Sequence, residues 1–275
     1  ILPADTRQGE SPKHKPGIDF LRDLRDKKVN TKGGASGPGS EQIGPITRGF
    51  LLLCCIIFLI STFTTPHPTA LPEGLPYAPF TMAQINKEAI YDYPEAYVLV
   101  DRLINLYGTD KLLNPETLPP EGKIIFAEAQ KTPYWNGFYS FFVEKFKTGE
   151  SPAIDAPLFE KIRQGEIWRL FTPCLLHSDF LHILFNMIWL IVLGKQIEQR
   201  MSPRRYVLFI LAVGIISNTC QYLMSGPNFI GFSGVVCGMV AFIWMRQKIA
   251  PWEGYPISQA TIGFLFYFIC AMLAI

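Results

Sequence analysis

Long apolar runs alternate with stretches of mixed polarity along this chain. Four runs are almost free of charged residues and cover residues 49–65, 181–194, 206–224 and 230–245, and a fifth begins near Tyr255 and continues to Ile275. Each run approaches or reaches the roughly 17 to 25 residues that a membrane-spanning helix needs. The pattern predicts an all-α, polytopic transmembrane helical bundle with five spans in this sequence.

The composition agrees with this pattern, since 49% of the residues are apolar and 17% are charged. An average soluble domain has more charge. The net charge of +2 follows from the distribution of charges around the spans, so we expect no nucleic acid partner. Five of the six cysteines fall inside the predicted spans, and Cys174 is the exception. We therefore predict no disulfide framework.

Lysine and arginine mark one side of the predicted bundle. Residues 1–48 contain 9 Lys or Arg and 6 Asp or Glu, and the short loop 195–205 contains 4 and 1. Residues 66–180 contain 10 Lys or Arg and 15 Asp or Glu. Positive residues concentrate in the short loops on the cytoplasmic side of membrane proteins. The amino terminus is therefore expected in the cytoplasm and the long segment outside.

The runs divide the chain into four parts. Residues 1–46 are rich in Lys, Asp, Gly, Ser and Pro and are expected to form a disordered cytoplasmic tail. Residues 47–65 are the first transmembrane helix, residues 66–165 an external helical insert, and residues 166–275 the membrane core. Because the sequence opens on Ile1 and stops within an apolar run, we expect it to be a fragment.

Two helices are predicted within this insert. Asp92, Pro94 and Glu95 form a typical helix start, and apolar residues then recur at helical spacing as far as Gly108. A second helix is predicted over residues 136–147, where phenylalanines alternate with polar residues. Its aromatic side chains suit either the lipid interface or the core of a small external subdomain, and the sequence favours neither.

A few polar residues in the predicted spans are candidates for chemistry, because a polar group in the bilayer needs a partner or a function. Asn218 and Gln221 in the third span are expected to form hydrogen bonds between helices. His182 in the second span and Ser233 in the fourth both lie near external ends, with Asn186 one turn below His182. A serine with two such donors suits nucleophilic attack on a carbonyl group.

Simpler interpretations exist for the same residues. One face of the fourth span lacks side chains at Gly231, Gly234 and Gly238. Alone, these glycines indicate close packing of helices. An isolated intramembrane His182 is as often structural as catalytic. His177 and His182 do not suit a metal site, because side chains five residues apart point about 140° apart on a helix.

Two motifs resemble those of the rhomboid family of intramembrane serine proteases. The first is Gly165-Glu166-Ile167-Trp168-Arg169-Leu170-Phe171-Thr172 followed by His177, His182 and Asn186, and the second is Gly231-Phe232-Ser233-Gly234. They resemble the family's Trp-Arg loop, its His and Asn signature and its Gly-x-Ser-Gly element, in the family's order. The resemblance covers residues 165–247 well and residues 49–65 loosely.

The resemblance implies a rhomboid-like core of six helices, five of them present, and an endopeptidase that cleaves transmembrane proteins near the external face. Ser233, in the same element as Gly231, would be the nucleophile. His182, Asn186 and the backbone N–H of Ser233 would stabilise the oxyanion. Glu166 and His177 would be structural. Expected partners are single-span membrane substrates and the lipid bilayer.

The resemblance also implies where the protein resides and what it lacks. Trp168 and Arg169 would anchor the Trp-Arg loop in the outer lipid leaflet. We expect a multi-pass integral protein of the bacterial inner membrane that needs no metal or cofactor.

Two features depart from the family pattern. Rhomboid proteases carry a catalytic histidine on the sixth span, and no histidine follows Ser233 here, so residues 1–275 alone are expected to be inactive. Cys237 stands where well-known bacterial relatives carry a tyrosine.

Two other functions stay open. One is a catalytically inactive pseudoprotease that binds membrane client proteins, which the retained Ser233 disfavours. The other is a channel or transporter, which is disfavoured because the polar residues are confined to the outer third of the bundle.

Overall fold

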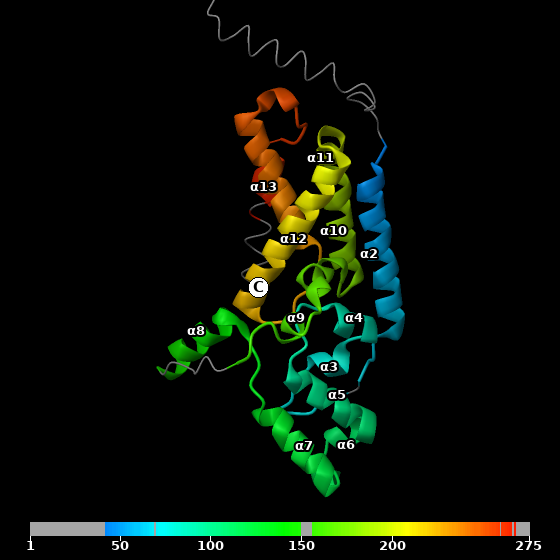
Figure 1. Ribbon diagram of the computed structural model, residues 1–275, viewed down its shortest axis with the longest axis vertical. Coiled ribbons are helices and arrows are strands. Elements are labelled where there is room, and N and C mark those ends of the chain that lie inside the picture. Colours follow the sequence, from blue (N-terminus) through cyan, green and yellow to red (C-terminus); the bar gives the residue numbers. More distant parts are fainter. Residues whose placement is uncertain (1–41, 69, 150–155, 259, 266, 268–275) are drawn as a thin grey trace, which may run out of the picture. The chain divides into compact units, whose positions relative to one another are not determined.

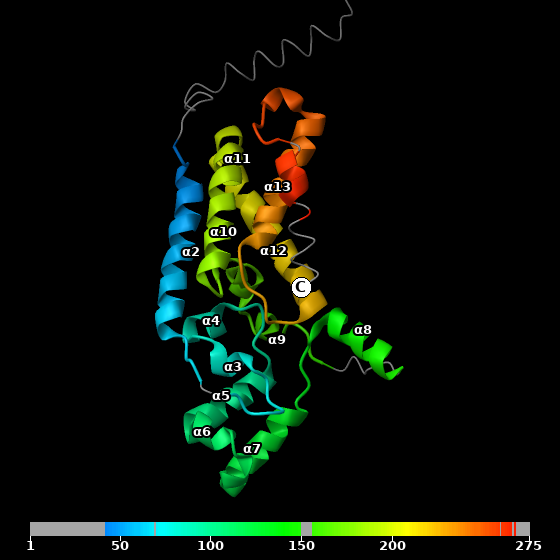
Figure 2. The same ribbon diagram turned by 180° about the vertical axis from the view of Figure 1, so that it is seen from behind.

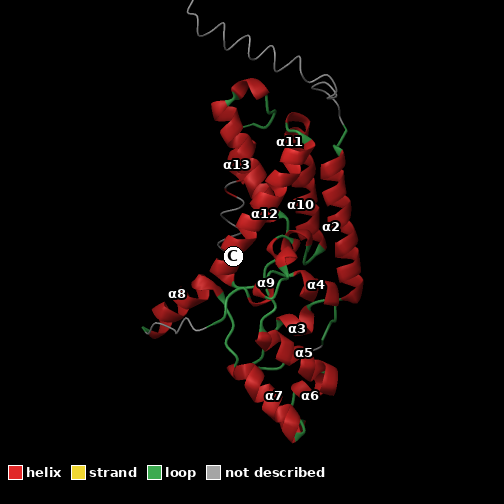
Figure 3. Ribbon diagram, viewed as in Figure 1, coloured by secondary structure: helices red, strands yellow, loops and turns green. Residues whose placement is uncertain are grey.

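A computed structural model describes residues 42–68, 70–149, 156–258, 260–265 and 267. All regular elements in these residues are helices, which confirms the predicted all-α class (Figures 1 and 3). The predicted disordered tail lies outside the described residues as far as Glu41, and so does much of the predicted fifth span.

Four long helical segments coincide with the first four apolar runs. They are α2 (Pro45–Thr64), α10 (Phe180–Trp189) continued by a π-helical turn η4 (Leu190–Gly194) and α11 (Lys195–Arg200), α12 (Pro203–Ser225) and α13 (Ser233–Ile249). Within the described chain, the helices long and apolar enough to cross a membrane are Pro45–Thr64, Phe180–Arg200 and Pro203–Ser225. α13 is shorter, at 17 residues. The protein is therefore an integral membrane protein.

These helices share one apolar core and expose apolar side chains around it. Cys54, Met187, Ile210 and Met239 come from α2, α10, α12 and α13 and are buried together. The outward faces carry large exposed apolar side chains, among them Leu52, Phe63, Leu208 and Ile216. Because such faces are unfavourable in water, they are typical of a bundle surrounded by lipid.

The direction of the chain alternates through the bundle. α2 and α12 end, and α10 and α13 begin, at the end of the bundle where the insert lies (Figures 1 and 2). His182 and Ser233 therefore lie at the starts of their helices on the same end of the bundle, as the apolar runs predict.

The insert, residues 66–165, is a set of short helices. They are α3 (Ala78–Thr81), α4 (Gln84–Ala89), α5 (Glu95–Tyr107), α6 (Thr109–Leu112), η1 (Pro115–Thr117), α7 (Pro120–Lys131), α8 (Gly137–Thr148) and α9 (Glu160–Arg163). Three 3-10 turns follow along the chain: η2 (Ile167–Leu170), η3 (Thr172–Leu175) and η5 (Pro251–Glu253). Leu103 of α5 and Phe126 of α7 are buried together in a separate core, so this part of the insert packs as a unit of its own.

Helix α5 begins and ends where the sequence predicts, but Asp92 does not cap it. The capping position is Pro94, which forms no side-chain capping bond. The carboxylate of Asp92 instead accepts the backbone N–H groups of Glu160 and Lys161, each at 3.0 Å, at the start of α9. The sequence predicts that Asp92 caps the helix that follows it. In the fold, Asp92 instead lies beside the free N–H groups at the start of α9, which is far away in the sequence.

Helix α8 matches the second predicted helix, and most of its aromatic rings are at least partly exposed. Tyr139 is 67% exposed and Phe146 is 87% exposed, while Phe138 packs edge-on against Trp135 with ring centroids 5.1 Å apart. Since most of its aromatic rings are not buried in a subdomain core, α8 has the exposure expected of a helix at the lipid interface.

Candidate functional site

The first turn of α10 holds His182 through a capping residue. Asp179 precedes the helix, and its Oδ1 accepts the backbone N–H of His182 at 2.9 Å. This bond, followed by the Ser178 hydroxyl bond, lowers the pKa of the Asp179 carboxyl, so the group is ionised at neutral pH. The sequence Ser178-Asp179 therefore fixes both the start of α10 and the position of His182 in its first turn.

Ser178 links the carboxylate of Asp179 to the imidazole of His182. The Ser178 hydroxyl donates to Asp179 Oδ2 at 2.7 Å. Ser178 Oγ is also bonded to His182 Nδ1 at 3.1 Å, and which of the two atoms donates depends on the tautomer of the imidazole.

Gly231 brings the backbone before Ser233 against this imidazole. Its φ is +124°, and a Cβ added there would lie 2.6 Å from His182 Nε2 and 3.8 Å from Asn186 Nδ2. The N–H of Gly231 donates to the carbonyl of Pro173 at 2.9 Å, which fixes the peptide in this position. Only glycine adopts this backbone angle without strain and, because it has no Cβ, avoids an overlap with His182. The fold thus brings together His182, Asn186 and Gly231.

Asn186 lies one turn below His182 and is buried. Its Nδ2 donates to the carbonyl of His182 at 2.9 Å, which orients the carboxamide toward the site.

Ser233 is the first residue of α13, and its side chain is exposed. Its hydroxyl forms no hydrogen bond with His182 or Asn186 in the described part of the chain. The backbone N–H groups in the first turn of a helix have no partner within the helix, and they favour negative charge. The nucleophile candidate therefore sits beside backbone donors of the kind that an oxyanion needs.

Close packing of α13 on α12 sets the position of this turn. A Cβ on Gly234 would overlap Ser217 Oγ, and a Cβ on Gly238 would overlap Val213 Cγ1. The small residues in the fourth run therefore allow α12 and α13 to approach closely, as predicted.

His177 supports His182 from the loop before α10. It is 2% exposed, its ring lies edge-on to that of His182 with centroids 5.2 Å apart, and neither nitrogen has a hydrogen-bond partner among the described residues. Burial, helped by the nearby His182, lowers the pKa of His177 to about 4. The ring is therefore neutral near pH 7 and acts through packing.

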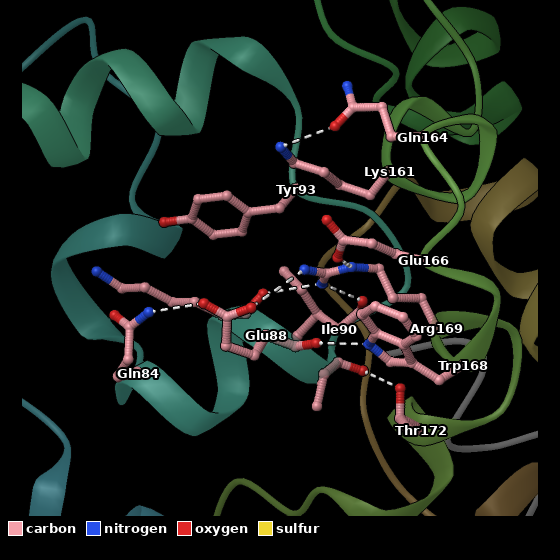
Figure 4. Close-up of polar contacts among 12 residues, drawn as sticks. Gln84, Glu88, Ile90, Tyr93, Lys161, Gln164, Glu166, Trp168, Arg169 and Thr172 are labelled. Carbon is pink, nitrogen blue, oxygen red and sulfur yellow. Dashed lines mark hydrogen bonds and ion pairs between the residues drawn. The ribbon is translucent and has the colours of Figure 1, made fainter.

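Residues of the insert hold the Trp-Arg loop through hydrogen bonds (Figure 4). Arg169 is 2% exposed, and its Nη1 donates to the carbonyls of Lys87 and Ile90, each at 2.8 Å. Its Nε donates to Glu166 Oε2 at 2.5 Å. The planar guanidinium satisfies free carbonyls at the end of α4, so the Arg169 side chain contacts protein, and its place in the outer leaflet stays a prediction.

Trp168 keeps the exposure expected of a residue at the interface. Its ring is 51% exposed, and its Nε1 donates to the carbonyl of Glu88 at 3.3 Å.

The two amides of the third span behave differently from each other. Asn218 Nδ2 donates to the carbonyl of Leu170 at 3.0 Å and so ties α12 to the Trp-Arg loop. Gln221 bonds to Ser225 Oγ within α12 at 3.0 Å, so the predicted bond between helices is wrong for this residue. Asn218 is buried against the Trp-Arg loop, whereas Gln221, one turn further along α12, is only partly buried.

One comparison with known protein families matches this part of the chain. A family model of the Rhomboid domain matches residues 164–275. The match begins just before Glu166 and contains His182, Asn186 and Ser233, so the whole constellation described above lies within it.

Proposed function

The chain belongs to the rhomboid family through its Rhomboid domain at residues 164–275, and from this we propose that it is an intramembrane serine endopeptidase. The observation that supports this activity most is the Gly231 backbone, held against His182 and Asn186 directly before Ser233. A retained nucleophile beside two polar side chains and free helix N–H groups is the arrangement needed for acyl transfer.

In the proposed reaction, Ser233 Oγ attacks the carbonyl carbon of a peptide bond as a base removes its proton. In this family-type reaction the base is a histidine, and no histidine follows Ser233 within residues 1–275. The Ser233 backbone N–H, Asn186 Nδ2 and a ring N–H of His182 stabilise the oxyanion. Loss of one such donor typically raises the barrier by about 2.7 to 4 kcal/mol. Collapse of the intermediate releases the amine product, and water then hydrolyses the acyl-enzyme.

The substrates are single-span membrane proteins whose helix unwinds near the site, because a helical peptide bond is shielded from attack. In this proposal the amino terminus is cytoplasmic, the insert and the site face the outside, and the membrane is a bacterial inner membrane. The positive loop 195–205 at the end of the bundle opposite the insert supports this orientation.

Cleavage of a single-span reporter tests the activity. Full-length protein and its Ser233→Ala variant are reconstituted in lipid vesicles with the reporter, and the products are followed by mass spectrometry. We expect cleavage by the wild type alone. Equal cleavage by both proteins would rule out Ser233 as the nucleophile, and reporter binding without cleavage by the wild type would indicate a pseudoprotease.

A further inference from the structure

The segment that delivers Ser233 is contacted along its length by residues of the insert. This segment, the delivery loop, comprises residues 226–232 between α12 and α13, and Figure 2 shows it in orange, passing the insert helices before it reaches α13. The Tyr97 hydroxyl of α5 donates to Asn228 Oδ1 at 3.1 Å. The rings of Tyr91 and Phe229 lie with centroids 5.7 Å apart.

The start of the delivery loop is also fitted to the insert. Gly226 has a φ of +74°, and a Cβ there would lie 2.7 Å from the carbonyl oxygen of Trp135. Trp135 Nε1 donates to the carbonyl of Tyr222 at 2.9 Å, in the last turn of α12. At Gly226 the loop therefore lies so close to the backbone of the insert that only a glycine fits.

A buried carboxylate joins the same turn of α12 to the insert. Asp92 is 1% exposed, and its Oδ2 accepts from the Tyr222 hydroxyl at 2.9 Å as well as from the N–H of Glu160. The Tyr222 hydroxyl in turn accepts the N–H of Phe159 at 3.1 Å. A buried carboxylate with charge-assisted bonds of this kind holds its partners in one geometry.

The far end of the delivery loop is the catalytic element itself. The N–H of Gly231 is bonded to Pro173, and Phe232 is fully buried, so these residues have little freedom to adjust on their own. With α12 fixed at one end and Gly231 at the other, the exposed Asn228 accepts a hydrogen bond from the insert in the middle of the loop, beside the ring contact of Phe229 with Tyr91.

We propose that the insert positions the nucleophile, acting through the delivery loop, and that Tyr97 is the positioning residue for its centre. The inference rests on the proposed function, because it concerns the orientation of Ser233 in catalysis. Tyr97 touches neither substrate nor the reacting atoms. Its removal should slow the reaction at Ser233 without weakening the binding of a probe.

The test compares two buried tyrosines in the full-length protein. Tyr97→Phe removes the bond to Asn228 and keeps the ring, which is fully buried beside Tyr93 and Tyr134. The matched control is Tyr93→Phe, which removes the 2.6 Å bond from the Tyr93 hydroxyl to Asp101 inside the insert and keeps the ring. The rate of Ser233 labelling by a fluorophosphonate is measured against probe concentration.

We expect Tyr97→Phe to lower the maximal labelling rate about fivefold to tenfold, the ratio that corresponds to one neutral hydrogen bond. The half-saturating probe concentration should not change, and Tyr93→Phe should label like the wild type. Asn228→Ala should reproduce the defect, and Asn228→Asp, which keeps an acceptor, should restore it. Because Asn228 is exposed, its variants should fold even if Tyr97→Phe does not.

Hydrogen exchange of the Gly231 N–H separates this inference from the proposed function. Tyr97→Phe should accelerate that exchange and Tyr93→Phe should not, whether or not Ser233 reacts. Absence of labelling in the wild type with this exchange difference would overturn the protease and leave the positioning intact. Unchanged exchange and an unchanged labelling rate in both Tyr97→Phe and Asn228→Ala would overturn the positioning.

Discussion

At the scale of single residues, Gly231 has the strictest requirements in the site. Gly231→Ala would place a Cβ 2.6 Å from His182 Nε2 at a φ of +124°. We expect the serine reactivity measured with a fluorophosphonate to fall by about a hundredfold or more, since oxyanion-type contacts of this kind are worth that much. The helix content seen by circular dichroism should stay the same.

The control for this substitution is Gly165→Ala. Gly165 also has a positive φ, +101°, but an added Cβ there meets no atom within 4 Å. It therefore reproduces the backbone strain without the overlap. Equal loss of reactivity in both variants would show that strain rather than contact with His182 is responsible.

His177 gives the protein a pH dependence of known sign. Its pKa is lowered from 6.5 to about 4 by burial, so the unfolded chain binds a proton first as the pH falls. Neutral His177 makes its full contribution to the free energy of unfolding above pH 6.5. This contribution is lost as the pH falls toward 4, and the loss is roughly 3 kcal/mol at most. His177→Gln should flatten this part of the curve of unfolding midpoint against pH. A parallel curve for the variant would contradict the assignment.

The candidate site residues can be selected from the sequence, but their surroundings cannot. His182, Asn186 and Ser233 stand out because polar residues in apolar runs are rare and chain direction places them at one end. Arg169 shows the limit of this reasoning. Its charge and neighbouring tryptophan suggest lipid headgroups, and only the fold reveals the free carbonyls of Lys87 and Ile90 that bury it.

At the scale of elements, the contact between α12 and α13 depends on small residues. Gly238→Ala would overlap Val213, whereas Gly49→Ala in α2 meets nothing within 4 Å. Overpacking of this kind costs about 1 to 3 kcal/mol. We expect Gly238→Ala alone to lower the unfolding midpoint in detergent. Similar midpoints for the two variants would show that α13 does not need this close approach.

Helix positions follow from local patterns, whereas helix partners do not. α5, α8 and the four long segments appear where periodicity and apolar length place them. Asp92 is the instructive exception, because its carboxylate satisfies α9 and Tyr222 rather than the helix that it precedes. Contacts between residues far apart in the chain depend on packing, which a single sequence does not encode in any local pattern.

At the scale of the whole molecule, the proposed orientation makes a prediction for intact cells. Glu116 lies on an exposed turn of the insert, and Arg204 lies on an exposed turn at the opposite end of the bundle. In the full-length protein with its own cysteines replaced, Glu116→Cys should react with a membrane-impermeant maleimide. Arg204→Cys should react only after lysis. The reverse pattern would overturn the orientation.

The most direct measurement of the central claim is labelling of full-length protein with a fluorophosphonate, followed by mapping of the modified residue. We expect one modified residue, Ser233, in the wild type, and no labelling of Ser233→Ala, because the site delivers this hydroxyl to an electrophile beside His182 and Asn186. Equal labelling of the two proteins would contradict the assignment of Ser233 as the nucleophile.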